Sequence, residues 1–156
     1  MAGFGEIGEL KVIDVLRRKN MTVYIPLKDK GIDFIAIKKN NFYQIQVKTS
    51  KFLKGNYFWF DLHKNSMIYS ENTFCVFVCI ILSGKKFMGK AINYIVIPSL
   101  DIKNWILLKD IVPKQGDENI LNIFIYPDPQ NKKWKYRNKG KELDLTAYWN
   151  NFSYFK

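Results

Sequence analysis

Three polar residues that suit a metal-assisted reaction lie inside two apolar, strand-like segments. Asp33 closes a Gly-Ile-Asp triplet, and Gln46 and Lys48 stand on either side of an apolar residue about a dozen positions later. Carboxylate and amide oxygens are ligands for a hard cation, and a lysine can orient a water molecule and offset phosphate charge. A lone Gln-x-Lys is also common on a solvated sheet face, so the elements that carry these residues must be considered first.

Both segments have the period-two pattern of a β-strand. Residues 32–38 and 42–50 form a predicted hairpin across the polar turn 39–41. In the second strand one face carries the apolar residues Ile45 and Val47, whereas Gln46 and Lys48 share the other face. We expect the first face to lie in the core and the second to point toward a cleft or solvent.

The rest of the chain alternates between helical and strand patterns. Residues 4–19 carry an apolar stripe and end in basic residues, which predicts an amphipathic helix. We expect a shorter helix at 99–108, with Ser99 as a candidate N-cap, and a last helix at 143–152. Strands are predicted at 21–26, 73–82, 91–98 and 120–126, and an aromatic run lies at 56–62. The pattern indicates an α/β protein without repeats or linkers.

Composition favours a polyanion as the partner. The 156 residues carry 25 Lys and Arg against 14 Asp and Glu, a formal net charge of +11, and 47% are apolar, which excludes a disordered chain. No apolar run approaches the roughly 18 residues of a membrane span, and we find no secretory signal, so we expect a cytoplasmic protein. Cys75 and Cys79 fit buried free thiols, and His63 is the single histidine. Phosphate-loop and dinucleotide motifs are missing, so we expect no nucleotide cofactor.

Taken together, these features resemble the PD-(D/E)XK nuclease superfamily. An N-terminal helix with Gly-Glu pairs, a Gly-Ile-Asp triplet and a Gln-Val-Lys triplet follow one another in the family's order over about residues 3–50. The resemblance implies an α/β fold with a restriction-endonuclease-like core, in which a mixed central β-sheet is flanked by helices. We expect one nuclease domain over 1–156, with the catalytic core at about 3–50 and a strand-rich DNA-binding elaboration at about 51–156.

The resemblance also implies a role for each site residue. Glu9 corresponds to the helical acid, Asp33 to the metal carboxylate, and Gln46, Val47 and Lys48 to the tripeptide. The metal ligands would be the Asp33 carboxylate, the Gln46 amide oxygen, the Val47 carbonyl and, through water, Glu9. The implied metal is Mg²⁺, with Mn²⁺ as an alternative. Lys48 would orient or help deprotonate the attacking water.

Two residues depart from the family's pattern, and one assignment stays open. Ile32 stands where the family has Pro, and Gln46 replaces the commoner carboxylate. Glu6 competes with Glu9 for the role of the helical acid because the two lie three residues apart on adjoining faces of the predicted helix.

Basic residues are candidates for phosphate contacts. The segment 131–141 places six cations and two aromatics, Trp134 and Tyr136, in eleven residues, which fits either a DNA groove contact or a solvated basic hairpin. In the first interpretation the two rings pack on sugar or base. The candidate DNA-binding residues are Lys51, Lys54, Lys85, Lys86, Lys132, Lys133, Lys135, Arg137 and Lys139.

The resemblance is strongest to the small intron-encoded homing endonucleases of cyanobacterial type. It implies a site-specific, Mg²⁺-dependent endonuclease that hydrolyses phosphodiester bonds in double-stranded DNA. A homo-oligomer, dimer or tetramer, is implied because one small domain cuts one strand. The alternatives are a Holliday-junction resolvase, another repair or restriction nuclease, and a non-catalytic DNA-binding module on a nuclease-like core.

Overall fold

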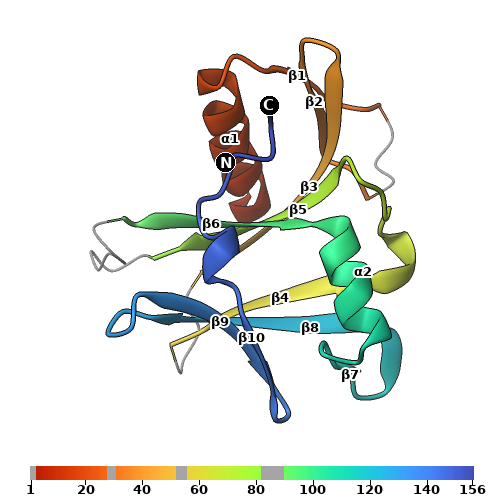
Figure 1. The fold of residues 1–156 in the computed structure, drawn as a ribbon, viewed down its shortest axis with the longest axis vertical. Helices are drawn as coiled ribbons and strands as arrows, with labels where there is room; N and C mark the ends of the chain where they lie inside the picture. The colour runs from red at the N-terminus through yellow and green to blue at the C-terminus, as the bar shows by residue number, and fades with distance from the viewer. Residues whose placement is uncertain (1–2, 28–30, 52–55, 82–89) are drawn as a thin grey trace.

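A mixed five-stranded sheet forms the centre of the protein. The computed structural model describes residues 3–27, 31–51, 56–81 and 90–156. The strands follow the order β1-β2-β3-β5-β6, in which β3 and β5 run parallel and every other neighbouring pair is antiparallel. This mixed sheet confirms the predicted α/β fold class (Figure 1). The strands are β1 (Thr22–Tyr24), β2 (Phe34–Lys38), β3 (Asn41–Lys51), β5 (Thr73–Ile80) and β6 (Ile92–Pro98).

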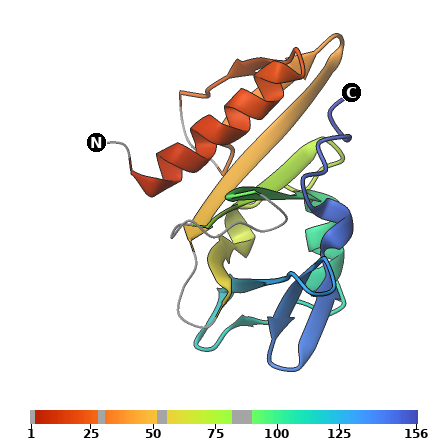
Figure 2. The same ribbon diagram turned by 90° about the vertical axis from the view of Figure 1, so that its left-hand side faces the viewer.

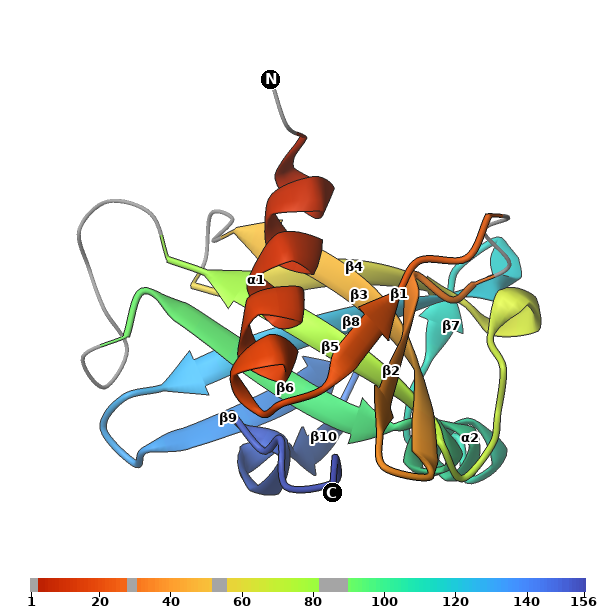
Figure 3. The same ribbon diagram turned by 90° about the horizontal axis from the view of Figure 1, so that it is seen from above.

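One long helix covers one face of this central sheet. Helix α1 (Phe4–Arg18) lies across the strands (Figure 3). Val12 and Leu16 are fully buried and pack in one cluster with Ile45 and Val47 of β3. The face of β3 that carries Ile45 and Val47 is therefore core, as its alternation predicts.

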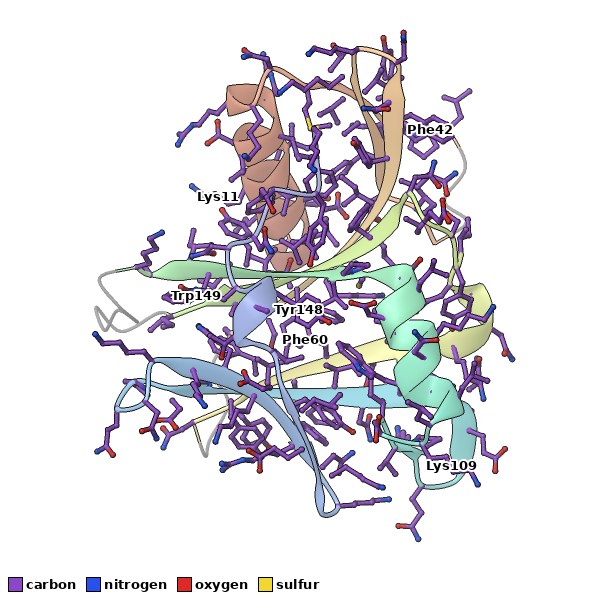
Figure 4. All side chains as sticks on the ribbon, viewed as in Figure 1. Lys11, Phe42, Phe60, Lys109, Tyr148 and Trp149 are labelled. Carbon is purple, nitrogen blue, oxygen red and sulfur yellow. The ribbon has the colours of Figure 1, made fainter. Side chains whose placement is uncertain are left out.

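A second, antiparallel sheet lies on the opposite side of the central sheet from α1 (Figure 2). Its inward side chains share a buried cluster with β5 and β6. Phe60 lies between the two sheets, and its ring centroid is 5.0 Å from that of Phe77 (Figure 4). The order is β10-β9-β8-β4 with β7 paired to β8, namely β4 (Phe58–His63), β7 (Pro113–Lys114), β8 (Asp117–Asp128), β9 (Lys133–Asn138) and β10 (Lys141–Asp144).

Strand β5 is buried along its whole length because it lies between the two layers. All eight of its residues are buried, and alternate ones join the α1-side cluster and the cluster between the sheets. A continuous apolar run is the sequence of a strand covered on both faces. Cys75 and Cys79 are buried free thiols, as predicted. The central sheet thus includes β5 and β6, which lie outside the segment of about residues 3–50 that carries the sequence resemblance.

The second helix begins where predicted, but Ser99 is not its N-cap. Helix α2 (Ser99–Leu107) has Pro98 at the N-cap position, without a side-chain cap. The Ser99 hydroxyl is buried instead against Ser70: it accepts a hydrogen bond from the Ser70 N–H and donates one to the Ser70 carbonyl, each 3.0 Å. Ser99 therefore joins α2 to the segment between β4 and β5, which includes the 3₁₀ turn η1 (Lys64–Ser66).

The helix predicted at 143–152 is wrong. The segment forms the end of β10, a single 3₁₀ turn η2 (Thr146–Tyr148) and irregular chain. Non-local contacts hold it: the Leu145 N–H donates to the Trp134 carbonyl, and Trp149 bridges to Ile95 of β6. Phe152 then packs in the α1-side cluster, so the segment crosses from one sheet to the other near Tyr148 and Trp149 (Figure 4).

Candidate active site

Asp33 is held against β3 by two hydrogen bonds. Its backbone N–H donates to the Ile45 carbonyl at 2.9 Å, and its carboxylate Oδ2 accepts from the Val47 N–H at 2.6 Å. Charge-assisted bonds of this length are the strong ones, so the carboxylate has a fixed place beside the Gln-Val-Lys triplet. The structure thereby brings together residues that are 14 positions apart in the chain.

The same bond indicates where the Val47 carbonyl points. In a strand, the N–H and C=O of one residue face the same neighbour, because paired residues exchange both bonds. The Val47 N–H faces Asp33, which lies just before β2 begins at Phe34. The Val47 carbonyl therefore points to the side of β3 on which the Asp33 carboxylate lies.

Gln46 and Lys48 lie on the face of β3 that is turned toward the second sheet. Gln46 is level with Cys75 and Lys48 with Phe77 in the parallel pair β3–β5, and both β5 side chains belong to the cluster between the sheets. Gln46 and Lys48 are half-buried. Gln44 on the same face has a structural role, since its amide oxygen accepts from the Thr73 hydroxyl at 2.9 Å.

The charges of Lys48 and Asp33 both change the pKa of Cys75, which is level with Gln46 on β5. Burial raises the pKa of the Cys75 thiol to about 12, while Lys48 lowers this pKa and Asp33 raises it. Asp33 and Lys48 therefore have opposite effects on the pKa of the same buried thiol. The thiol stays neutral at physiological pH and adds no charge to the site.

Gly31 permits the backbone that presents Asp33. Its φ is +83°, a conformation in which side chains are strained. A Cβ on Gly31 would also collide with the backbone carbonyl oxygen of Ser66 in η1. The glycine thus allows η1 to approach closely two residues before the carboxylate.

Gly8 sets the height of α1 over β3. A Cβ built on Gly8 would overlap Thr49 Oγ1 and lie 2.9 Å from Thr49 Cβ, so only glycine allows this approach. Thr49 is the residue after Lys48. The first half of α1 therefore lies over the end of β3 that carries the Gln-Val-Lys triplet.

The two acidic residues of this half of α1 have different surroundings. Glu6 is exposed, and its carboxylate Oε2 accepts from the Gly3 N–H at 3.3 Å, as expected for a residue that caps its own helix. Glu9 is half-buried and adjoins the Gly8–Thr49 contact. This difference supports Glu9 over Glu6 as the helical acid; the assignment stays a prediction.

The donor atoms around Asp33 fit a hard cation held by few carboxylates. In the described part of the chain, no three His, Cys, Asp or Glu side chains group closely enough to hold a metal ion by themselves. Mg²⁺ commonly binds through one or two carboxylates, waters and substrate phosphates rather than in such a cage. The Asp33 carboxylate and the Val47 carbonyl on its side, with the amide of the neighbouring residue Gln46, would give an all-oxygen set of this kind.

The candidate DNA-binding residues are only partly placed by the structure. Lys54, Lys85 and Lys86 lie outside the described residues. Lys51 is exposed at the end of β3. Of the five candidates in the segment 131–141, four are exposed and Lys135 is half-buried. The ion pairs of β9 with β10 are Lys133–Asp144 at 3.9 Å, Lys135–Glu142 at 3.2 Å and Arg137–Glu142 at 3.6 Å.

Trp134 and Tyr136 are buried and therefore not available to DNA, contrary to one of the two interpretations above. They are 0% and 1% exposed and pack in the cluster between the sheets. The period-two alternation of β9, Lys-Trp-Lys-Tyr-Arg, could have indicated this, because it puts both rings on the face opposite the cations. The rings beside Arg137 come instead from Tyr57, Phe124 and Tyr126, and no pattern in the sequence selects them.

Comparison with solved structures shows that the fold resembles that of a bacterial enzyme. The chain is similar to the structure described as "a bacterial homing endonuclease", I-Ssp6803I, with a TM-score of 0.57 over 96% of this chain and 88% of that chain, at 14% sequence identity. No family model and no curated protein matches the sequence. Among the described residues, no helix is long and apolar enough to cross a membrane. The protein thus has a homing-endonuclease-like α/β fold.

Proposed function

We propose that this protein is a metal-dependent endonuclease that hydrolyses phosphodiester bonds in double-stranded DNA, as a site-specific homing endonuclease of the PD-(D/E)XK superfamily. The observation that carries the proposal is the 2.6 Å bond from the Val47 N–H to the Asp33 carboxylate, which joins the two halves of the motif. The fold likeness to a bacterial homing endonuclease supports it. The formal net charge of +11 supports DNA as the substrate.

In this proposal the oxygens around Asp33 hold Mg²⁺ or Mn²⁺. Asp33 supplies the negative charge, and the Val47 carbonyl and Gln46 amide supply neutral oxygens. The bound cation would supply Lewis acidity toward the scissile phosphate and lower the pKa of a coordinated water. Gln46 lowers the negative charge of the site, which favours one cation over two, and Glu9 supports a looser second position through water.

Lys48 is the proposed positioning group for the nucleophile. Its ammonium, two residues after Gln46 on one strand face, can orient a water beside the phosphate and offset charge that develops in the transition state. Because this interaction grows in the transition state, removing it lowers the rate more than it weakens DNA binding.

Cleavage of both strands requires two such sites. One catalytic domain cuts one strand, and a symmetric homo-oligomer presents the second site to the other strand. A dimer or tetramer would therefore bind a partly palindromic target.

The test is cleavage of a supercoiled plasmid library by wild type, Lys48→Ala and Asp33→Asn, with Mg²⁺ or with EDTA. We expect metal-dependent cuts from wild type, rates at least about 100-fold lower in both variants, and dissociation constants in EDTA within a few-fold of wild type. Lys103→Ala, an exposed lysine of α2, is the matched control and should cut normally. Unchanged cleavage by Asp33→Asn would refute the site.

Synthetic four-way junctions in the same assay separate the enzyme classes. Cutting at one plasmid site indicates homing, whereas structure-specific cutting of junctions indicates a resolvase. Salt-sensitive DNA binding without cuts in either substrate would favour the non-catalytic binding module, for which the amide of Gln46 in place of a carboxylate is the specific observation.

A further inference from the structure

A row of aromatic rings crosses the outward face of the second sheet. Trp59 of β4 stands directly opposite Phe124 of β8, with ring centroids 5.8 Å apart. Tyr57 joins both β8 rings, at 5.6 Å from Phe124 and 5.3 Å from Tyr126. These four residues, Tyr57, Trp59, Phe124 and Tyr126, are called the ring row. Trp59 is 43% exposed, although burial of a tryptophan ring stabilises a protein strongly.

Cations border the ring row on one side. Arg137 lies over the Tyr126 ring at 5.9 Å from its centroid. Tyr57, Phe124 and Tyr126 form one wall of a pocket of about 410 Å³, and the turn between β9 and β10 forms the other. That turn brings Arg137, Lys139 and Lys141 to the pocket against the single acid Glu142, so three positive charges face one negative charge.

We propose that this face binds single-stranded DNA, with unpaired bases stacked on the ring row and phosphates held at Arg137, Lys139 and Lys141. Exposed rings beside a positive groove are the combination by which proteins bind single strands, because every base has a flat face that can stack. The flat faces of bases in a duplex are already covered by their neighbours, so a duplex would contact the cations alone. The pocket volume is in the range of small-ligand sites and suits one nucleotide.

This surface is separate from the candidate active site. The inward face of the second sheet, which carries Phe58, Phe60 and Leu62, packs against the central sheet, and the ring row lies on the opposite face of the same strands. Binding there needs neither Asp33 nor Lys48. The proposal therefore goes beyond the proposed cleavage and can be tested without it.

The experiment measures binding of fluorescein-labelled (dT)₁₂ by fluorescence anisotropy in EDTA, which keeps cleavage out of the readout. The variants are Phe124→Leu and Tyr126→Leu, which keep apolar bulk and remove the ring. Phe42→Leu is the matched control, since Phe42 is a 51% exposed aromatic on β3 of the central sheet. We expect dissociation constants about tenfold or more higher for each ring-row variant and unchanged for Phe42→Leu.

Two surface variants keep the test valid if a ring-row variant fails to fold. Lys139 in the turn and Lys141 at the start of β10 are both exposed, and Lys139→Gln or Lys141→Gln should each flatten the logarithmic salt dependence of (dT)₁₂ binding by about 0.7. A labelled 12-base-pair duplex is measured in parallel and should be insensitive to the loss of either ring. Wild type that fails to bind (dT)₁₂, ring-row variants that bind it like wild type, or equal losses for duplex and single strand would each overturn the proposal.

Discussion

At the scale of single residues, the environment separates side chains that look alike in the sequence. Glu6 and Glu9 lie three positions apart on the same helix, yet Glu6 accepts a bond from the Gly3 N–H and is exposed, whereas Glu9 is half-buried beside the contact of α1 with β3. Gln44 and Gln46 likewise share a strand face, but Gln44 is bonded to Thr73. Of the polar residues on this face of β3, Gln46 and Lys48 therefore remain as candidates for the site at Asp33.

Substitution of the two helical acids tests which one serves the site. We expect Glu9→Gln to slow Mg²⁺-dependent cleavage at least about tenfold, because the neutral amide retains the shape of the side chain but loses the charge near the proposed metal site. Glu6→Gln is the control: it should cut at the wild-type rate and lose about 0.5 kcal/mol of stability at most, since it weakens a helix-end interaction only. Initial rates on cleaved plasmid measure both, and a slower Glu6→Gln with a normal Glu9→Gln would reverse the assignment.

At the scale of elements, glycines and strand alternation decide how the layers approach each other. Gly8 allows α1 to lie directly on Thr49, and Gly31 allows η1 to lie against the chain before Asp33. In β9 the alternation sends Trp134 inward and leaves Lys133 and Lys135 on the other face. A segment that looks uniformly basic and aromatic in the sequence therefore has two faces of different chemistry.

The glycines of α1 offer a matched pair for testing the approach of the helix. Gly8→Ala should destabilise the protein by about 1–3 kcal/mol, because the new methyl group overlaps Thr49 and overpacked sites cost this much. Gly5→Ala, where a Cβ would meet nothing within 4 Å, should be neutral or stabilising by at most about 1 kcal/mol. Urea denaturation gives both free energies of unfolding. Equal stability of the two variants would mean that α1 does not rest on Thr49.

At the scale of the whole molecule, the positive charge is less available than its total indicates. The net charge is +11, but three of the β9 cations pair with Glu142 and Asp144 of β10. Exposed ion pairs contribute little to stability, about 0–1 kcal/mol. The carboxylates of Glu142 and Asp144 nonetheless lie beside the cations that are candidates for phosphate contacts. These carboxylates repel phosphate.

Neutralising the two acids should therefore strengthen DNA binding. We expect the double variant Glu142→Gln, Asp144→Asn to bind duplex DNA more tightly at low salt and to lose affinity more steeply as salt rises, because its positive charge increases by two. The triple variant Lys133→Gln, Lys135→Gln, Arg137→Gln should bind duplex DNA more weakly at low salt and lose affinity less steeply as salt rises. Anisotropy titrations across a series of salt concentrations measure both slopes. If neither variant changes the slope, the β9–β10 hairpin lies outside the duplex interface.

The sequence by itself determined the parts of the protein whose signal is local. Period-two alternation places the hairpin of β2 and β3, and an apolar stripe places α1. The unbroken apolar run of residues 74–80 is typical of a strand buried on both faces. The order Glu9, Asp33, Gln46-Val47-Lys48 depends only on these elements. Its role in catalysis and the single domain over 1–156 stay predictions.

Only the tertiary structure decided the features that join distant segments. A helix is predicted at 143–152, but backbone bonds to Trp134 and Ile95 hold the segment in an irregular path. The ring row brings together Tyr57 and Phe124, and Glu142 meets Lys135 across a turn. Such contacts depend on which strands pair and on which face each sheet buries. The free energy that selects this arrangement comes from packing throughout the core, so no local sequence pattern reports it.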